Sequence, residues 1–312
     1  MSWLSERVRA TPRAALGGTL AGIVLFLVVA AATFGIRPEQ VGVCLLVLFA
    51  LVYSPGSRRF LLGILPFVIL GVVFDLSRLL KPLLELVTVH VKEPYAFDKA
   101  LFGISSAGGT LTPNEFFRLH HAPWLDFVTG LAYIAYLYEA MGFGLYLAVF
   151  RRTSDGRRLL ARFGWVFLGV NLMGFATYYI YPAAPPWYVE LHGFGPVDLT
   201  TPPHAAAALR WDELTGIPYF QHFYARGASV FGAIPSLHAA YPLIVFFYAR
   251  ELGKRWLTIA TFAFFCLVCF SAVYLQHHYI LDVGVGALYA VVGCLVERLV
   301  TRRFFPRAAF AA

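Results

Sequence analysis

Residues 257–299 read LTIATFAFFCLVCFSAVYLQHHYILDVGVGALYAVVGCLVERL, in which two apolar runs, 257–275 and 279–299, flank a short polar turn. A helix needs about 20 predominantly apolar residues to cross the roughly 30 Å hydrocarbon core of a bilayer. Each run is about that long. We therefore expect a hairpin of two membrane-spanning helices, with its turn at one surface of the bilayer.

Six further apolar runs precede this hairpin, near residues 15–36, 38–55, 60–80, 125–150, 159–181 and 236–249. The second and sixth are the shortest, because Pro55 ends one and Arg250 limits the other. Of the 312 residues, 59% are hydrophobic and 13% are charged, whereas about a quarter of the residues in a soluble domain are charged. The sequence predicts an all-α, polytopic membrane bundle of about eight transmembrane helices.

Basic residues indicate the orientation of this bundle. Eight crossings place both termini on one side, and only eight of the 25 Lys and Arg residues then fall on the other side: Arg37, Arg78, Lys81, Lys92, Lys99, Arg118, Arg210 and Arg226. The positive-inside rule makes the termini cytoplasmic. Topology thus explains most of the net charge of +8, and we expect no nucleic-acid partner.

Two long segments, 81–124 and 182–235, remain on the outer side and mix aromatic, proline and charged residues. The alternation of apolar and polar groups over 89–91 and 97–102 suits helices lying in the membrane interface. No repeat or low-complexity tract divides the chain. We expect one membrane domain over 1–312, with a catalytic core at about 125–300 and accessory helices at 15–80.

The end of the fifth apolar run reads YYIYPAAPPWY over 178–188. Its prolines stop the helix and stiffen the chain that follows. Taken alone, the aromatic residues Tyr181, Trp187 and Tyr188 fit an ordinary interfacial belt. They become candidates for substrate binding through the polar groups that we expect to face them.

The sixth apolar run opens with FGAIPSLH, residues 231–238. Pro235 and Ser236 suit the first turn and cap of a helix, which leaves backbone N–H groups free. A helix N-terminus of this kind favours anions. His238 falls in the same turn, so it is either a simple capping side chain or a functional group beside an anion site.

The turn between the last two runs carries His277, His278 and Asp282. If a helix begins near His277, Asp282 follows His278 by four residues and shares its face. The carboxylate would then hold one imidazole nitrogen as a donor and present the other as a nucleophile. A buried structural His–Asp pair is the alternative.

Pro-Ser-x-His at 235–238 and His-x-x-x-Asp at 278–282 resemble the second and third motifs of the type 2 phosphatidic acid phosphatase superfamily. With YPAAPPWY before them, they are most similar to the inositol phosphorylceramide synthases and their bacterial relatives. The resemblance implies that His278 is the nucleophile, that Asp282 orients it and that His238 is the acid and base. It also implies that Ser236 binds phosphate, and that the enzyme lies in a bacterial inner membrane with its site facing outward.

Cationic residues of the superfamily are missing from this chain. The first motif, Lys then six residues then Arg-Pro, is absent, and Ala272 stands where the third motif has Arg. A phosphomonoester carries close to two charges near neutral pH, whereas a diester carries one, so a weaker clamp suits a diester. For the remaining positive charge we consider Arg226, His277 and Arg78, although Arg78 is equally suited to pair with Asp75.

The leading hypothesis is a phosphotransferase that moves a phosphate-linked head group, such as phosphoinositol, from a glycerophospholipid to a lipid hydroxyl such as that of ceramide. A lipid phosphomonoester phosphatase is the first alternative, and a non-catalytic lipid-binding or transport protein is the second. Aspartates are scattered rather than clustered, so we expect neither a metal nor another cofactor. The six other outer histidines, His90, His120, His121, His192, His204 and His222, are expected at the surface or interface.

Overall fold

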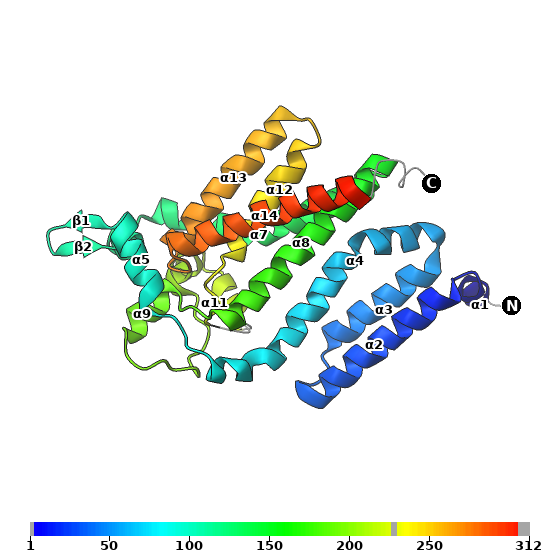
Figure 1. Cartoon of the computed structure of the whole chain (residues 1–312), viewed down its shortest axis with the longest axis horizontal. Coiled ribbons are helices and arrows are strands. Elements are labelled where there is room, and N and C mark those ends of the chain that lie inside the picture. Colours follow the sequence, from blue (N-terminus) through cyan, green and yellow to red (C-terminus); the bar gives the residue numbers. More distant parts are fainter. Residues whose placement is uncertain (1–2, 226–229, 305–312) are drawn as a thin grey trace.

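The computed structural model describes residues 3–225 and 230–304, and helices occupy all eight positions expected from the apolar runs (Figure 1). They are α2 (Arg13–Thr33), α3 (Pro38–Tyr53), α4 (Pro55–Leu76), α7 (Pro123–Phe150), α8 (Ser154–Ile180), α12 (Leu237–Arg250), α13 (Arg255–Tyr274) and α14 (Ile280–Phe304). Within the described ranges, six of these are long and apolar enough to cross a membrane, while α3 has 16 residues and α12 has 14. The expected all-α membrane bundle is confirmed, and the two shortest runs give the two shortest of these helices.

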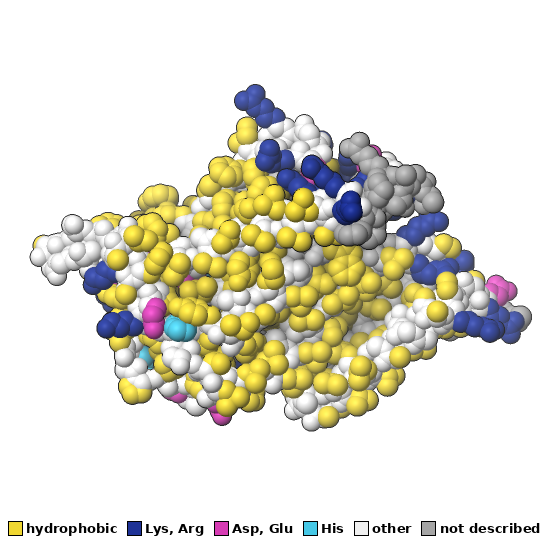
Figure 2. All heavy atoms as spheres, viewed as in Figure 1, with side chains coloured by type: hydrophobic (Ala, Val, Ile, Leu, Met, Phe, Trp, Pro, Cys, Tyr) yellow, Lys and Arg dark blue, Asp and Glu magenta, His cyan; other side chains and the backbone are white. Residues whose placement is uncertain are grey.

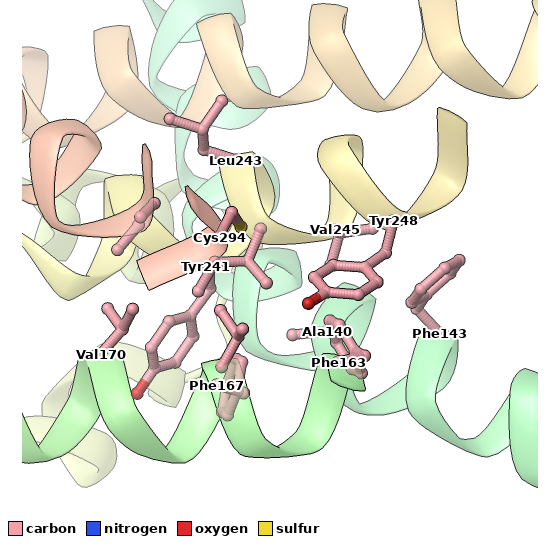
Figure 3. Packing of buried hydrophobic residues seen from close by; sticks show 14 of the residues in the cluster. Ala140, Phe143, Phe163, Phe167, Val170, Tyr241, Leu243, Val245, Tyr248 and Cys294 are labelled. Atoms are coloured by element: carbon pink, nitrogen blue, oxygen red, sulfur yellow. The ribbon is translucent and has the colours of Figure 1, made fainter. Parts of the chain in front are cut away.

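Helix α12 lies at the centre of the bundle, in contact with α7, α8, α13 and α14. Figure 3 shows its residues Tyr241 and Tyr248 packed against Phe163 and Phe167 of α8. The Tyr241 hydroxyl also donates a hydrogen bond to the Asn171 side chain. Because α12 is surrounded on all sides, its position and that of its first turn are fixed by the core.

The N-terminal helices pack at the side of this core. The short α1 (Trp3–Arg9) contacts α3, α2 contacts α3, α3 contacts α4, and α4 contacts α8. Arg37 and Gln40 bond to the Asp75 carboxylate, which joins α3 to the end of α4. Most of α2 is exposed and apolar, as expected for a helix that faces lipid. The division into a catalytic core and accessory helices stays a prediction.

The two outer segments fold into short elements at one end of the bundle. The first contains the 3₁₀ helix η1 (Ser77–Leu86), α5 (Lys92–Phe102), a hairpin of β1 (Ile104–Ser106) and β2 (Gly109–Leu111), and α6 (Pro113–Leu119). The second contains α9 (Pro186–His192), η2 (Ala206–Ala208), α10 (Leu209–Thr215) and α11 (Tyr219–Tyr224). The hairpin was not expected. Figure 1 places these elements at the end opposite α1 and the last turns of α14.

Candidate active site

Three extended segments form the base of the site. The Ala183 N–H donates to the Phe231 carbonyl at 2.9 Å, and the Ala183 carbonyl accepts from the Ala233 N–H at 3.2 Å. On the other side, the His90 carbonyl accepts from the Ala184 N–H at 2.9 Å. Ala183 and Ala184 are completely buried. Small side chains are needed here, because the segment is enclosed between two others.

Helix α12 begins at Leu237, so Pro235 precedes the helix rather than occupying its first turn. Ser236 is at the N-cap position, but its side chain makes no capping hydrogen bond, contrary to expectation. Its buried Oγ has no hydrogen-bond partner. Pro242 has no N–H to bond to the His238 carbonyl, so one helical hydrogen bond is also missing at this turn.

The sequence predicts a helix that begins near His277, but α14 begins at Ile280. His278 therefore lies in the turn that precedes the helix. Asp282 nevertheless faces His278, because its carboxylate caps the first turn of α14. The Asp282 Oδ2 accepts the Tyr279 backbone N–H at 2.9 Å, as an acidic residue at the third helical position does in a capping box. This bond turns the carboxylate towards the residues that precede the helix.

Two side chains from the first outer segment hold this turn in place. Asp98 of α5 is fully buried and accepts the backbone N–H groups of Ile280 and Leu281 at 2.7 and 3.0 Å. Burial raises the pKa of its carboxyl to about 6. Asn114 of α6 donates through Nδ2 to the Val273 carbonyl at 2.9 Å and to the His278 carbonyl at 3.0 Å. The histidine turn is therefore fixed by residues more than 150 positions away in sequence.

His238, His278 and Asp282 form a continuous chain of contacts. His278 Nδ1 lies 3.4 Å from Asp282 Oδ2, and His278 Nε2 lies 3.0 Å from His238 Nδ1. An ionised carboxylate only accepts, so we assign the proton to His278 Nδ1, and Nε2 then accepts from His238. His278 is 5% exposed and Asp282 is fully buried. The carboxylate thus presents Nε2 as the electron-pair donor.

Aromatic rings enclose the histidines. Tyr133 of α7 stacks on His238 with a centroid distance of 4.4 Å, and it stacks on His277 at 5.2 Å. Tyr224 also stacks on His277, with a centroid distance of 4.5 Å. Burial between these rings lowers the pKa of His277 to about 3, and its Nε2 lies 3.1 Å from the Ala205 carbonyl. His277 is therefore neutral at pH 7 and does not supply the positive charge that we had considered for it.

A cavity of about 130 Å³ opens beside the three histidines. Trp187, Tyr133 and Tyr224 contribute aromatic walls, and His204, His238, His277 and His278 contribute the polar groups. His204 was expected at the surface, but it lines this cavity, and burial lowers its pKa as well. No Lys or Arg lines the cavity among residues 3–225 and 230–304. Ala272, which stands where the third superfamily motif has Arg, is completely buried and adds no positive charge.

Some of the other residues predicted to bind substrate line the cavity, and others have partners elsewhere. Trp187 lines the cavity, whereas the Tyr188 hydroxyl accepts the Asp198 N–H at 2.9 Å and Tyr181 stacks on His90 at 3.8 Å. Neither tyrosine is among the residues that line the cavity. Arg78 lies 3.8 Å from Asp75, so the pairing alternative is the one observed. Arg226 lies outside the described residues, and Tyr224 and Val230 on either side of it line the cavity.

Several residues of the site were missed from the sequence. Tyr133 resembles any other aromatic residue of an apolar run, and Asp98 and Asn114 belong to segments without a motif. Only the folded chain brings them to the histidines. A local signal existed for Asp98 alone, because a charged residue within the apolar pattern of 97–102 needs a partner when that helix is buried.

A carboxylate-held imidazole that contacts a second imidazole suits an enzyme that transfers phosphoryl groups, because the first can act as the nucleophile and the second as the acid and base. Residues 110–296 match the family model described as the PAP2 superfamily, and the chain belongs to this superfamily. The expected class, a membrane phosphotransferase, is thereby confirmed.

Relatives of known activity extend this assignment. The chain is 40% identical over 275 residues to the phosphoinositol dihydroceramide synthase of Bacteroides thetaiotaomicron, which covers 88% of both proteins. It is 28% identical over 244 residues to the inositol phosphorylceramide synthase of Candida albicans, covering 76% of this chain and 48% of the fungal protein. The catalytic subunit of the Saccharomyces cerevisiae inositol phosphorylceramide synthase is 31% identical over 126 residues, which are 39% of this chain and 30% of the yeast subunit. No solved structure matches the chain significantly.

Proposed function

We propose that this protein transfers phosphoinositol from a glycerophospholipid to the hydroxyl of a ceramide or dihydroceramide. The observation that carries the proposal is the pairing of His238 and His278 in a cavity to which the described residues contribute no Lys or Arg. A singly charged diester needs less compensation than a phosphomonoester. The names of the relatives specify the same head group and the same class of acceptor.

In the first half-reaction, Nε2 of His278 attacks the phosphorus of the donor. The bond between phosphorus and the diacylglycerol oxygen breaks, and His238, as the imidazolium, gives one of its two ring protons to that oxygen. Attack requires the lone pair that accepts the His238 Nδ1–H, so the 3.0 Å bond between the imidazoles must open as the phosphate enters. Asp282 stabilises the positive charge that develops on His278.

In the second half-reaction, His238 removes the proton of the acceptor hydroxyl, and the resulting oxygen attacks phosphorus. The bond between phosphorus and Nε2 breaks, which releases the phosphorylated lipid and restores His278. The free N–H groups at the start of α12 are close to His238 and favour the anionic oxygens throughout. Ser236, whose buried Oγ has no partner, is suited to bond to one of those oxygens.

We further infer that the termini are cytoplasmic and that the site faces the periplasm of a bacterial inner membrane. Lys and Arg side chains gather at the end of the bundle that carries α1 and the last turns of α14 (Figures 1 and 2). His278 precedes the start of α14 at the opposite end, among the short outer elements (Figure 1), and His238 contacts it. Donor and acceptor lipids would then reach the cavity from the outer leaflet.

The purified protein in detergent provides the test. We expect phosphatidylinositol and ceramide to yield inositol phosphorylceramide and diacylglycerol, and we expect His278→Ala and His238→Ala to abolish the product. Phosphatidic acid should release little free phosphate. Phosphate release that exceeds head-group transfer would replace this proposal with a phosphatase, and transfer that survives both substitutions would refute the histidine mechanism.

A further inference from the structure

A cavity of about 510 Å³ lies at the end of the bundle opposite the histidines. It is formed where α7 ends, α8 begins, α12 ends and α14 reaches its last turns. Five arginines line it: Arg151, Arg158, Arg162, Arg298 and Arg302. Figure 2 shows Lys and Arg side chains gathered at this end of the molecule. The volume is within the range of about 300–1,000 Å³ that is typical of ligand pockets.

Arg162 pairs with two of the nearby carboxylates. Its guanidinium donates to both oxygens of Glu251, at 2.6 and 3.0 Å, and to both oxygens of Glu297, at 2.7 and 3.0 Å. The Arg162 side chain is only 16% exposed, so these bonds form the rigid base of the cavity. The single charge of Arg162 balances one of these two carboxylates, and Arg298 approaches Glu251 to 3.9 Å.

The other lining residues leave an excess of positive charge. Arg151, Arg158, Arg298 and Arg302 share the cavity with one further carboxylate, that of Asp155. Arg151, Arg162, Arg298 and Arg302 carry four positive charges against the three carboxylates of Asp155, Glu251 and Glu297, so these residues leave a net positive charge even without Arg158. A cavity of this composition favours an anion with several acceptor oxygens, such as a phosphodiester.

The backbone between α7 and α8 is shaped to bring Arg151 to the cavity. A Cβ on Gly156 would lie 1.9 Å from the Arg151 carbonyl oxygen, so only glycine allows the turn to close in this way. The Thr153 Oγ1 accepts the Gly156 N–H at 3.2 Å and fixes the first turn of α8. The position of Arg151 is thus set by the turn and does not depend on a flexible loop.

We propose that this cavity binds the phosphate of an anionic membrane lipid in the leaflet on the side of the termini. The planar guanidinium group of arginine can donate two hydrogen bonds to the oxygens of one phosphate. Basic pockets between membrane helices are suited to acidic lipid head groups. A lipid is favoured over a soluble anion because exposed apolar side chains are sequence neighbours of the lining arginines: Phe150, next to Arg151, is 74% exposed, and Leu299, next to Arg298, is 67% exposed. These side chains provide a path for acyl chains beside the head group.

The test measures binding of tail-labelled phosphatidylglycerol to the delipidated full-length protein in neutral detergent, with phosphatidylcholine as the zwitterionic comparison. Arg151→Gln/Arg302→Gln removes two lining charges and spares the Arg162 network. Arg152→Gln/Arg303→Gln removes two neighbouring charges that do not line the cavity. Each cation contributes about fivefold to affinity for an anionic lipid surface, so we expect about 30-fold weaker binding for the first variant and near-normal binding for the second.

Equal losses in the two variants, or equal affinity for phosphatidylcholine, would overturn the assignment. Inorganic phosphate and glycerol phosphate are added as competitors. Displacement of the lipid only at concentrations far above its own dissociation constant supports a lipid site, whereas displacement at similar concentrations would show that the site takes a soluble anion. Binding is measured without turnover, so the outcome is independent of the proposed transferase activity.

Discussion

Gly286 of α14 lies against Ser236, the residue that leads into α12 and His238. A Cβ at this position would lie 2.1 Å from the Ser236 carbonyl oxygen and 2.9 Å from its carbonyl carbon. A hydrogen bond also joins the two segments, because the Ser236 N–H donates to the Asp282 carbonyl at 2.9 Å. Gly286→Ala therefore forces the start of α12, and His238 with it, away from α14.

The size of the effect follows from this distance. Ordinary contact begins at 3.4 Å, so the Ser236 carbonyl must move by about 1.3 Å, the difference between 3.4 and 2.1 Å. A displacement of about 1 Å at a reacting group costs roughly 100-fold in rate. Overpacking costs about 1–3 kcal/mol of stability, which exceeds the gain of up to about 1 kcal/mol from replacing glycine by alanine in a helix.

Gly284→Ala is the matched control, because its Cβ meets no atom within 4 Å. Head-group transfer and thermal unfolding are measured for both variants in the same detergent. We expect Gly286→Ala to lose about 100-fold in transfer and to unfold at a lower temperature, while Gly284→Ala keeps its activity. Equal activity of the two variants would refute the claim that helix contact positions the histidines.

Four other residues give further predictions. Asp98→Asn removes one of two acceptors for the α14 N–H groups and should cost about 1 kcal/mol of stability; an unchanged melting temperature would contradict this. Asn114→Ala frees the Val273 and His278 carbonyls and should lower kcat more than it raises KM, and a change in KM alone would count against a positioning role. Burial holds the pKa of folded His277 near 3, below its ordinary 6.5, so the unfolded chain binds more protons between these values and stability falls as the pH is lowered through that range. His277→Gln should flatten this fall, measured by unfolding at pH 7 and 4.5, and an equally steep profile would disprove the assignment. Arg226→Ala should lower kcat/KM for the diester by about 10- to 100-fold if its charge meets the phosphate, whereas normal kinetics would exclude it.

The sequence predicts the helices well because an apolar run of sufficient length needs no distant information to become a membrane helix. It also places His278 and Asp282 together, because their spacing is local. The roles of Asp98 and Asn114 could not be predicted, because their hydrogen bonds to the start of α14 and to the histidine turn form only on folding. His277 was misjudged as a cation for the same reason: two tyrosines from distant segments bury it and keep it neutral.

For Ser236 the expected capping bond is wrong, while its phosphate-binding role stays a prediction; Tyr188 does not line the cavity. The sequence indicated the helix start at 237 but not that the Ser236 side chain would leave the capping position unused. Tyr188 belongs to a motif, yet its hydroxyl serves the backbone at Asp198. A motif locates a segment at the site, while packing decides which of its side chains face the cavity.

The most direct test of the mechanism is to trap the covalent intermediate. Protein incubated with phosphatidylinositol labelled with ³²P, without ceramide, is quenched in alkali, digested and analysed by mass spectrometry. The account predicts an acid-labile phosphoinositol adduct on His278 that is absent from His278→Ala and is discharged when ceramide is added. A label on another residue, or transfer by His278→Ala at the wild-type rate, would contradict it.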